Sequence, residues 1–188
     1  MRIIAGKAGR IAIKVPSAVA RPTTDFVRQA VFSILGERIE QAKVLDLFAG
    51  SGALGLESLS RGATSCTFVD DHRQAIKTIS ENLTKTRLSG GHSVKSDVSS
   101  FLKRDPSCYD LIFADPPYWK YHGDKDHLSD LFTAGLLHDR LASNGWLIAE
   151  ISSHQASPAS ADFTLVARRE YGSSTIVIYS ALAAVQIS

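Results

Sequence analysis

Cysteine is scarce in this sequence, and no long apolar run is present. Only Cys66 and Cys108 occur among 188 residues, each in or beside an apolar segment, so we expect two reduced core thiols in a cytosolic protein. The most apolar stretch, residues 176–185, is interrupted by Tyr179 and Ser180 and is far too short to span a bilayer. We expect no signal peptide at the start of the chain. We therefore expect a soluble, cytoplasmic protein that does not associate with a membrane.

Internal repeats, low-complexity tracts and shifts in composition are also absent. With 44% hydrophobic residues the chain can bury a substantial core, which favours one compact enzyme domain. We assign this domain to residues 21–188 and expect residues 1–20 to form a small basic extension. No cluster of cysteines or carboxylates has the spacing of metal ligands, so no metal is expected.

The net charge is small but unevenly distributed. The chain has 21 basic and 19 acidic residues, for a formal net charge of +2. Up to position 28 there is a single acid, Asp25, while the basic residues in the same stretch are Arg2, Lys7, Arg10, Lys14, Arg21 and Arg28. Proteins bind the phosphate backbone of nucleic acids with basic faces of this kind. An ordinary solvated hairpin rich in lysine and arginine is the alternative.

The N-terminal part predicts a hairpin followed by a helix. Residues 2–5 and 10–15 have the pattern of two strands joined by a glycine-containing turn. Two threonines and an aspartate at residues 23–25 are suitable caps for a helix whose apolar positions recur at helical spacing and which ends at Gly36. Arg28 is expected to project from the polar side of this helix.

From residue 43 onward, strand-like and helix-like segments alternate. Strands are expected around Val44, Cys66, Ser93, Leu111 and Trp146, with helices beginning near Ala53, His72, Asp97 and Asp124. This alternation predicts an α/β fold with a mostly parallel sheet, in which ligands bind at the carboxyl ends of the strands. Two apolar runs, residues 163–167 and 175–179, predict a C-terminal antiparallel hairpin that completes a seven-stranded sheet.

The segment D-L-F-A-G-S-G at residues 46–52 joins a buried strand to a helix. Its glycines allow backbone N–H groups to approach a ligand at the N-terminus of the helix. Residues 50–55 also match the dinucleotide pattern G-x-G-x-x-G, with Asp70 at the expected interval. NAD therefore competes with other nucleotide-like cofactors for this loop.

Asp46 separates these possibilities. A carboxylate at the mouth of the loop repels a pyrophosphate but attracts the ammonium or sulfonium of S-adenosylmethionine, by roughly 4 kcal/mol of gross Coulomb energy at about 4 Å and a dielectric of about 20. Asp70 then accepts hydrogen bonds from the ribose hydroxyls, and Asp97 faces the adenine amine. Turn capping by Asp46 and helix capping by Asp97 are the alternatives. The cofactor-binding candidates are Asp46, Phe48, Gly50, Gly52, Asp70 and Asp97.

The motif D-P-P-Y at residues 115–118 ends an apolar run. An exocyclic amine of a nucleobase is a poor nucleophile, and the Asp115 carboxylate and the Pro116 carbonyl can accept its two hydrogens and aim its nitrogen. Consecutive prolines fix φ and remove two N–H donors, and Tyr118 offers an aromatic face for an unstacked base, worth about 1–3 kcal/mol. In-line methyl transfer depends on positioning rather than on a strong base. The catalytic candidates are Asp115, Pro116 and Tyr118, and an ordinary proline turn is the alternative.

These motifs resemble those of the bacterial RsmD-type guanine-N2 methyltransferases, which act on 16S ribosomal RNA. The similarity spans nearly the whole chain and includes M-R-I-I-A-G at residues 1–6, R-P-T-T-D at residues 21–25, the run at residues 45–57, and D-P-P-Y. It implies a Rossmann-like class I methyltransferase fold with S-adenosylmethionine as the methyl donor. It also implies a target guanine in a small-subunit rRNA hairpin, modified during ribosome assembly.

The same resemblance implies that Arg21, Thr23 and Arg28 lie near the RNA-facing opening of the active site. Trp119 is expected either to stack on the target base or to pack beneath a loop. The substrate-binding candidates are Arg2, Lys7, Arg10, Arg21, Thr23, Arg28, Pro117 and Trp119. We expect a monomer whose partner is 16S rRNA within an assembly particle. The alternatives are a DNA adenine-N6 methyltransferase, a non-catalytic RNA-binding assembly factor, and an NAD-dependent reductase, which Asp46 disfavours.

Overall fold

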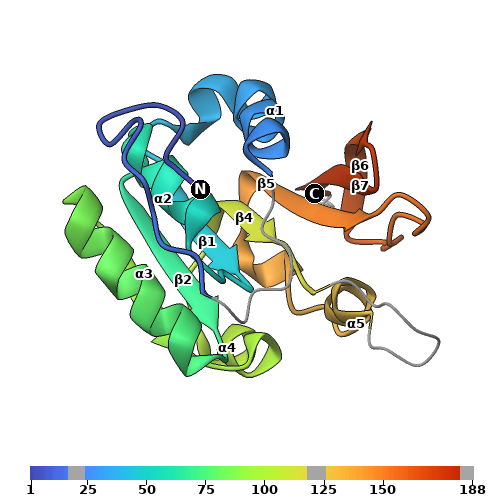
Figure 1. The fold of residues 1–188 in the computed structure, drawn as a ribbon. Coiled ribbons are helices and arrows are strands. Elements are labelled where there is room, and N and C mark those ends of the chain that lie inside the picture. The colour runs from blue at the N-terminus through green and yellow to red at the C-terminus, as the bar shows by residue number, and fades with distance from the viewer. Residues whose placement is uncertain (17–23, 118–125, 183–188) are drawn as a thin grey trace.

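A seven-stranded mixed sheet forms the centre of the molecule (Figure 1). The computed structural model describes residues 1–16, 24–117 and 126–182. The strands lie in the order β3-β2-β1-β4-β5-β7-β6, with β1 to β5 parallel and β7 antiparallel to both of its neighbours. Their bounds are β1 (Lys43–Leu47), β2 (Ser65–Asp70), β3 (Gly91–Lys95), β4 (Tyr109–Ala114), β5 (Leu141–Ser152), β6 (Phe163–Tyr171) and β7 (Ser174–Ala181). The predicted parallel sheet with a C-terminal antiparallel hairpin is confirmed.

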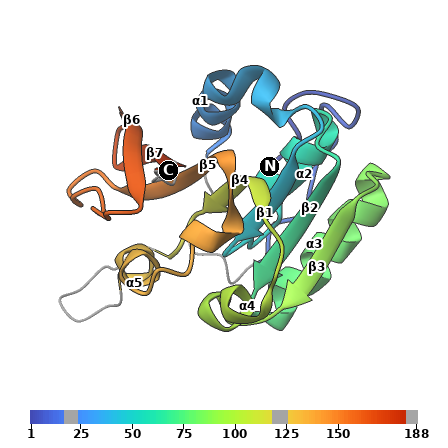
Figure 2. The same cartoon turned by 180° about the vertical axis from the view of Figure 1, so that it is seen from behind.

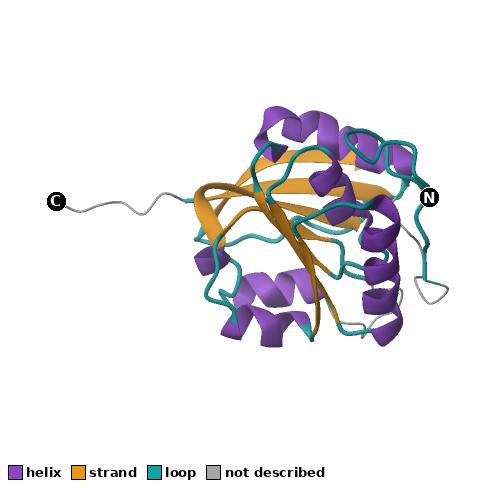
Figure 3. Ribbon diagram, turned by 90° about the vertical axis from the view of Figure 1, so that its left-hand side faces the viewer, coloured by secondary structure: helices purple, strands orange, loops and turns teal. Residues whose placement is uncertain are grey.

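Helices cover both faces of this sheet (Figures 2 and 3). They are α1 (Asp25–Leu35), α2 (Ala53–Ser60), α3 (Arg73–Thr86), α4 (Val98–Arg104) and α5 (His127–Thr133), with the short 3₁₀ helices η1 (Gly36–Ile39) and η2 (His138–Arg140). Buried side chains of α1, α2 and α3 share one core cluster, and those of α4 and α5 share a second. None of the helices in the described ranges is both long enough and apolar enough to cross a bilayer.

The strands separate the two clusters by alternating their side chains. Val44 and Phe113 belong to the cluster beneath α1, α2 and α3, whereas their neighbours Leu45 and Ile112 belong to the cluster beneath α4 and α5. This is the period-two geometry of a strand whose two faces are both covered. Apolar residues on both faces of β1 and β4 therefore reflect a central position in the sheet.

Helix α1 begins and ends where the sequence predicts. The Thr24 side chain accepts a hydrogen bond from the Val27 N–H at 3.2 Å, and Gly36 follows the last residue with φ +52°. The expectation that Arg28 projects from the polar side of the helix is wrong, because its side chain is 0% exposed. Arg28 shares a helical face with the buried residues Val31, Phe32 and Leu35, at spacings of three, four and seven.

The buried guanidinium of Arg28 joins α1 to the N-terminal segment, defined here as residues 1–16. Its Nη2 donates to the Arg2 carbonyl and to Asp25 Oδ1, both at 2.7 Å. Its Nη1 lies 3.9 Å from Oε2 of Glu57, a residue of α2 that is also 0% exposed. The arginine therefore bridges three parts of the chain from inside the core.

The two strands predicted for an N-terminal β-hairpin do not form, although residues 1–3 and 10–13 face each other through antiparallel backbone hydrogen bonds. Among the described residues, the N-terminal segment contributes one isolated antiparallel bridge, between Arg2 and Ala12, and no strand. The Glu57 carboxylate accepts hydrogen bonds from the amides of Ile4 at 2.7 Å and Ala5 at 3.0 Å. These donors are therefore committed to α2 rather than to a partner strand.

The N-terminal segment also packs into the core. Ile3 and Ile13 are 0% and 6% exposed and belong to the cluster of α1, α2 and α3. At its turn, the Lys7 N–H donates to the Ser60 carbonyl at 2.7 Å. Gly6 has φ +80°, and a Cβ on it would lie 1.9 Å from the Ser60 oxygen, so only glycine permits this approach to α2. The division of the chain into residues 1–20 and residues 21–188 stays a prediction.

Candidate functional site

The loop between β1 and α2 is held in a conformation that requires glycine. This glycine loop, residues 48–52, contains Phe48 at φ +57°, Gly50 at φ +53° and Gly52 at φ +76°. A Cβ on Gly52 would meet Ile79 Cγ1 at 3.1 Å and Phe68 Cε1 at 3.2 Å. Gly52 then serves as the N-cap residue of α2. The loop therefore sits at a helix N-terminus, where backbone N–H groups favour an electron-rich ligand.

Asp46 lies near the end of β1, directly before this loop, and is 2% exposed. Its Oδ2 accepts a hydrogen bond from the Gly55 N–H, in the first turn of α2, at 2.9 Å. Burial raises the pKa of Asp46 to about 8; the Gly55 hydrogen bond opposes this, and the nearby charges of Asp115 and Asp70 add to it. Asp46 thus bonds to a backbone N–H of α2, a contact related to the turn capping that was its alternative role, while its position beside the loop leaves the cofactor role open.

Asp70, the last residue of β2, ties the glycine loop to the start of α3. It is 8% exposed. Its Oδ2 accepts a hydrogen bond from the Gly50 N–H at 2.8 Å, and its Oδ1 accepts one from the His72 N–H at 2.9 Å. Each carboxylate oxygen has a second acceptor site, so these contacts are compatible with a hydroxyl-bearing ligand.

Asp97 caps α4 and is exposed. Its Oδ1 accepts a hydrogen bond from the Ser100 N–H at 2.8 Å, and this contact is the main cause that lowers the pKa of Asp97 below its ordinary value. Asp97 therefore makes the helix-capping contact that was the alternative to a role at the adenine amine. The carboxylate lies at the edge of the sheet, after β3, on the same side as the other strand ends.

Asp115 follows β4, the strand next to β1. Leu47 pairs with Ala114 in the sheet, so the residues after them leave neighbouring strand ends together. Asp115 and Pro116 are half-buried, and Pro117 is exposed. Because the Asp115 charge acts on the pKa of Asp46, the two carboxyls face a common region. Tyr118 and Trp119, which continue the motif, lie outside the described residues.

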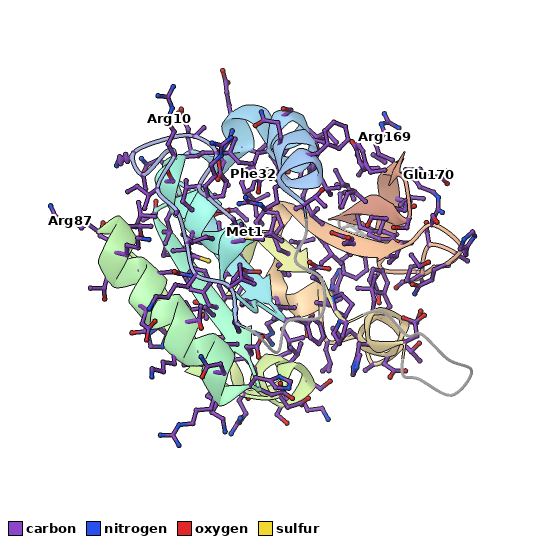
Figure 4. The ribbon with its side chains drawn as sticks, viewed as in Figure 1. Met1, Arg10, Phe32, Arg87, Arg169 and Glu170 are labelled. Carbon is purple, nitrogen blue, oxygen red and sulfur yellow. The ribbon has the colours of Figure 1, made fainter. Side chains whose placement is uncertain are left out.

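The basic candidates are not gathered at this edge. Arg2, Lys7 and Arg10 are exposed, but Lys7 lies at the C-terminal end of α2, whereas the glycine loop lies at its N-terminal end. Arg10 projects away from the sheet (Figure 4). Arg2 lies 4.0 Å from Asp25. Arg28 is buried, and Arg21 and Thr23 fall outside the described residues.

Two polar residues that connect to the glycine loop were not selected as site candidates from the sequence. Asn82 of α3 is 0% exposed and donates to the Ser51 carbonyl at 3.0 Å. Lys14 is exposed and lies beside Asn82. The sequence carries a signal for the first of these, because Asn82 continues the buried positions 75, 78 and 79 of α3 at helical spacing.

One group of metal-ligating side chains is found in the part of the chain that the structure describes. Ligand atoms of Asp70, Asp71 and His72 lie within 4.8 Å of one another. Asp70 is already bonded to the glycine loop, and His72 contacts the exposed Asp71. The group is accounted for by these contacts and carries no metal assignment.

Comparisons with known proteins agree with this architecture. The family model described as "Conserved hypothetical protein 95" matches residues 1–180. The chain is 36% identical over 186 residues to "Putative rRNA methyltransferase YlbH" of Bacillus subtilis, covering 95% of this chain and 98% of that protein. It is also 36% identical over 154 residues to "Ribosomal RNA small subunit methyltransferase D" of Escherichia coli, covering 80% and 71% of the two chains.

A solved structure gives the same result. The Escherichia coli protein described as "Putative methyltransferase yhhF" superposes with a TM-score of 0.85 and 32% sequence identity, over 97% of this chain and 98% of that one. The family resemblance that the motifs predicted is therefore confirmed: the chain belongs to the RsmD/YlbH family.

Proposed function

We propose that this protein is an enzyme that transfers a methyl group from S-adenosylmethionine to the N2 amine of one guanine in 16S rRNA. Its substrate is the small ribosomal subunit during assembly in the cytoplasm, and the enzyme acts as a monomer. The observation that carries the proposal is the meeting of Asp46 and Asp115 at adjacent strand ends beside the glycine loop. Relatives that are 36% identical and named as rRNA methyltransferases support the substrate class.

The residues of the loop fit S-adenosylmethionine. Asp46 is buried, and burial raises its pKa to about 8, with no cation among the causes that the described residues supply; a positively charged group at this place would therefore stabilise its ionised form. The ammonium of the methionine moiety is such a group. Backbone groups from Phe48 to Gly52 would line the ligand, Asp70 would receive the ribose hydroxyls, and Asp97 would face the adenine amine.

The residues after β4 fit an amine acceptor. When bound, S-adenosylmethionine supplies an electrophilic methyl group on its sulfonium. Asp115 and the Pro116 carbonyl would accept the two N2 hydrogens and hold the nitrogen lone pair toward that methyl group. The nitrogen would gain the methyl group as the methyl–sulfur bond breaks, with S-adenosylhomocysteine as the leaving group, and the methylated amine would pass its extra proton through Asp115 to water. Alignment of the reacting atoms supplies most of the rate enhancement in such a displacement. Pro117, Tyr118 and Trp119 would flank the base.

The N-terminal segment is the proposed RNA-facing surface. Arg2, Lys7 and Arg10 are exposed along it, and each phosphate contact by such a residue adds salt-dependent affinity. Arg21 and Thr23 are proposed to approach the RNA closer to the target base. Arg28, being buried, would act by holding Arg2 and α2 in place rather than by touching RNA.

Ligand affinity should depend on pH through Asp46. In the free protein this carboxyl has a pKa of about 8 and is mostly protonated at pH 6. A bound ammonium favours the ionised form, so binding releases a proton and affinity rises with pH until about pH 8, with a limiting slope of about tenfold per pH unit. Titration calorimetry with S-adenosylhomocysteine, which carries the same ammonium, should show about 25-fold tighter binding at pH 7.5 than at pH 6.

Asp46→Asn should bind more weakly and lose this pH dependence, because its side chain does not ionise. Asp139→Asn, which removes an exposed carboxyl, is the matched control and should keep it. A wild-type affinity that is flat from pH 6 to 7.5 would show that Asp46 does not hold the ammonium.

The reaction itself is tested with labelled S-adenosylmethionine. Unmodified small ribosomal subunits and unmethylated DNA are incubated in parallel, digested, and analysed for modified nucleosides. N2-methylguanosine from the subunits is the expected product. N6-methyladenine from DNA would instead identify a DNA methyltransferase, and ligand binding without transfer to either substrate would favour a non-catalytic assembly factor.

A further inference from the structure

Asn82 uses its whole side-chain amide to join two distant parts of the chain. Its Oδ1 accepts a hydrogen bond from the Lys14 N–H at 2.8 Å, and its Nδ2 donates to the Lys14 carbonyl at 2.9 Å. The same Nδ2 donates to the Ser51 carbonyl, in the glycine loop, at 3.0 Å. The residue is 0% exposed. A buried amide with both donors and its acceptor engaged tolerates little movement of either partner.

A second contact runs between the same two parts. The Ser51 hydroxyl donates to the Met1 sulfur at 3.8 Å. Met1 is in turn paired with the returning arm of the N-terminal segment, because its carbonyl accepts from the Ile13 N–H at 3.1 Å. Both arms of the N-terminal segment therefore end against the glycine loop.

The rest of the N-terminal segment rests on α2, the helix that begins at the glycine loop. Ser60 is its most extensive anchor: the Ser60 hydroxyl accepts from the Ala8 N–H at 2.9 Å and donates to the Ala5 carbonyl at 2.6 Å. A shift of the glycine loop thus acts on the segment at its ends through Asn82 and Ser51, and along its length through α2.

We propose that Asn82 is a positioning residue that couples the N-terminal segment to the glycine loop, so that ligand binding at the loop and docking of the segment favour each other. This inference rests on the proposed function, which makes the loop the S-adenosylmethionine site and the segment an RNA-facing surface. Coupling between two sites is reciprocal in binding free energy. The enzyme would accordingly present its basic segment in the ordered form when the methyl donor is bound.

Hydrogen exchange of the full-length protein tests the coupling without RNA. Peptides covering residues 1–16 are followed with and without saturating S-adenosylhomocysteine. In the wild type, the ligand should slow exchange of these amides about fivefold or more, a coupling in the usual range. In Asn82→Ala the segment should exchange about tenfold faster, and its response to the ligand should disappear while exchange of β1 and β4 stays protected.

Two further variants sharpen the result. Glu81→Ala removes the exposed 2.7 Å ion pair with Lys14 Nζ but leaves every Asn82 contact, so its ligand response should match the wild type. Gly6→Ala leaves Asn82 intact and displaces the segment from Ser60, so it should weaken S-adenosylhomocysteine binding by the same fivefold factor. If Asn82→Ala does not fold, Gly6→Ala alone tests the coupling.

The outcomes separate this inference from the proposed function. Ligand binding that leaves exchange of residues 1–16 unchanged in the wild type would overturn the coupling and leave the proposed function standing. Absence of S-adenosylhomocysteine binding by the wild type would overturn the proposed function, and the coupling with it. A uniform rise in exchange across the whole Asn82→Ala domain would show a structural role only.

Discussion

Replacing Asp115 by alanine is expected to reduce methyl transfer by about 10²–10³-fold while leaving S-adenosylhomocysteine affinity within about threefold of the wild type. The reason is that Asp115 would hold the attacking amine, and loss of one preorganised polar contact at a reacting centre typically costs this much. Asp46 and Asp70, the proposed cofactor residues, belong to other strand ends, and their hydrogen bonds to Gly55 and Gly50 should persist. Single-turnover methyl transfer and titration calorimetry measure the two quantities separately.

The same strand supplies a matched control. Asp110 is an exposed carboxylate at the opposite end of β4, where it accepts a hydrogen bond from the Lys43 N–H at 2.8 Å. Asp110→Ala should therefore leave transfer nearly unchanged, because it lies away from the strand ends that form the site. Joint loss of transfer and ligand affinity in Asp115→Ala would contradict the assignment and make Asp115 a support of the cofactor site.

The elements of the fold were predictable because they are encoded locally. The cap at Thr24, the stop at Gly36 and the apolar runs of β1 and β4 each depend on a few consecutive residues. The alternation of strands and helices indicates a parallel sheet, because parallel strands need helical crossovers. The sequence therefore predicted the sheet and its antiparallel hairpin without knowledge of any tertiary contact.

The N-terminal segment was mispredicted because its partners are remote in sequence. The amides of Ile4 and Ala5 bond to Glu57, more than 50 residues away. Nothing in residues 1–16 indicates that Glu57 is the acceptor, so the glycines of the turn led to the prediction of a hairpin. The same carboxylate lies 3.9 Å from the buried guanidinium of Arg28, a contact that is also remote in sequence.

The candidate site was predictable to a similar extent. Asp46, Asp70 and Asp115 could be assigned to strand ends because each follows an apolar run, and the structure brings them to one edge of the sheet. Asn82 could not be linked to Ser51 or Lys14, since that link requires the packing of α3 against both the loop and the N-terminal segment. Which polar residue supports a site is thus a tertiary property.

Glu57→Ala is expected to lower the free energy of unfolding by about 3–5 kcal/mol, the usual cost of removing one partner from a buried ion pair. Glu57 is 0% exposed and accepts hydrogen bonds from two backbone amides and, at 2.6 Å, from Arg61 Nε. Its removal leaves the Ile4 and Ala5 amides without an acceptor and Arg28 buried without its nearest carboxylate on α2. For a chain of this length, thermal unfolding should shift down by about 10 °C.

Glu81→Ala is the control for that measurement, because its ion pair with Lys14 is exposed at the surface and such pairs contribute about 0–1 kcal/mol.

A second substitution separates the effect of charge from the effect of packing. Adding Arg28→Met to Glu57→Ala removes a buried charge that has lost its carboxylate on α2 and should recover part of the lost stability. The recovery stays partial because the Ile4 and Ala5 amides and Arg61 still lack Glu57, and the Arg28 bonds to Arg2 and Asp25 are also lost. Arg28→Met alone is measured as well. If it lowers the free energy of unfolding by the same amount in the wild type and in Glu57→Ala, the two side chains act independently. The Glu57 carboxylate would then serve only as a backbone acceptor. Partial recovery of the free energy of unfolding would instead establish that Glu57 stabilises the buried charge of Arg28. It would also establish that the docking of the N-terminal segment depends on this pair.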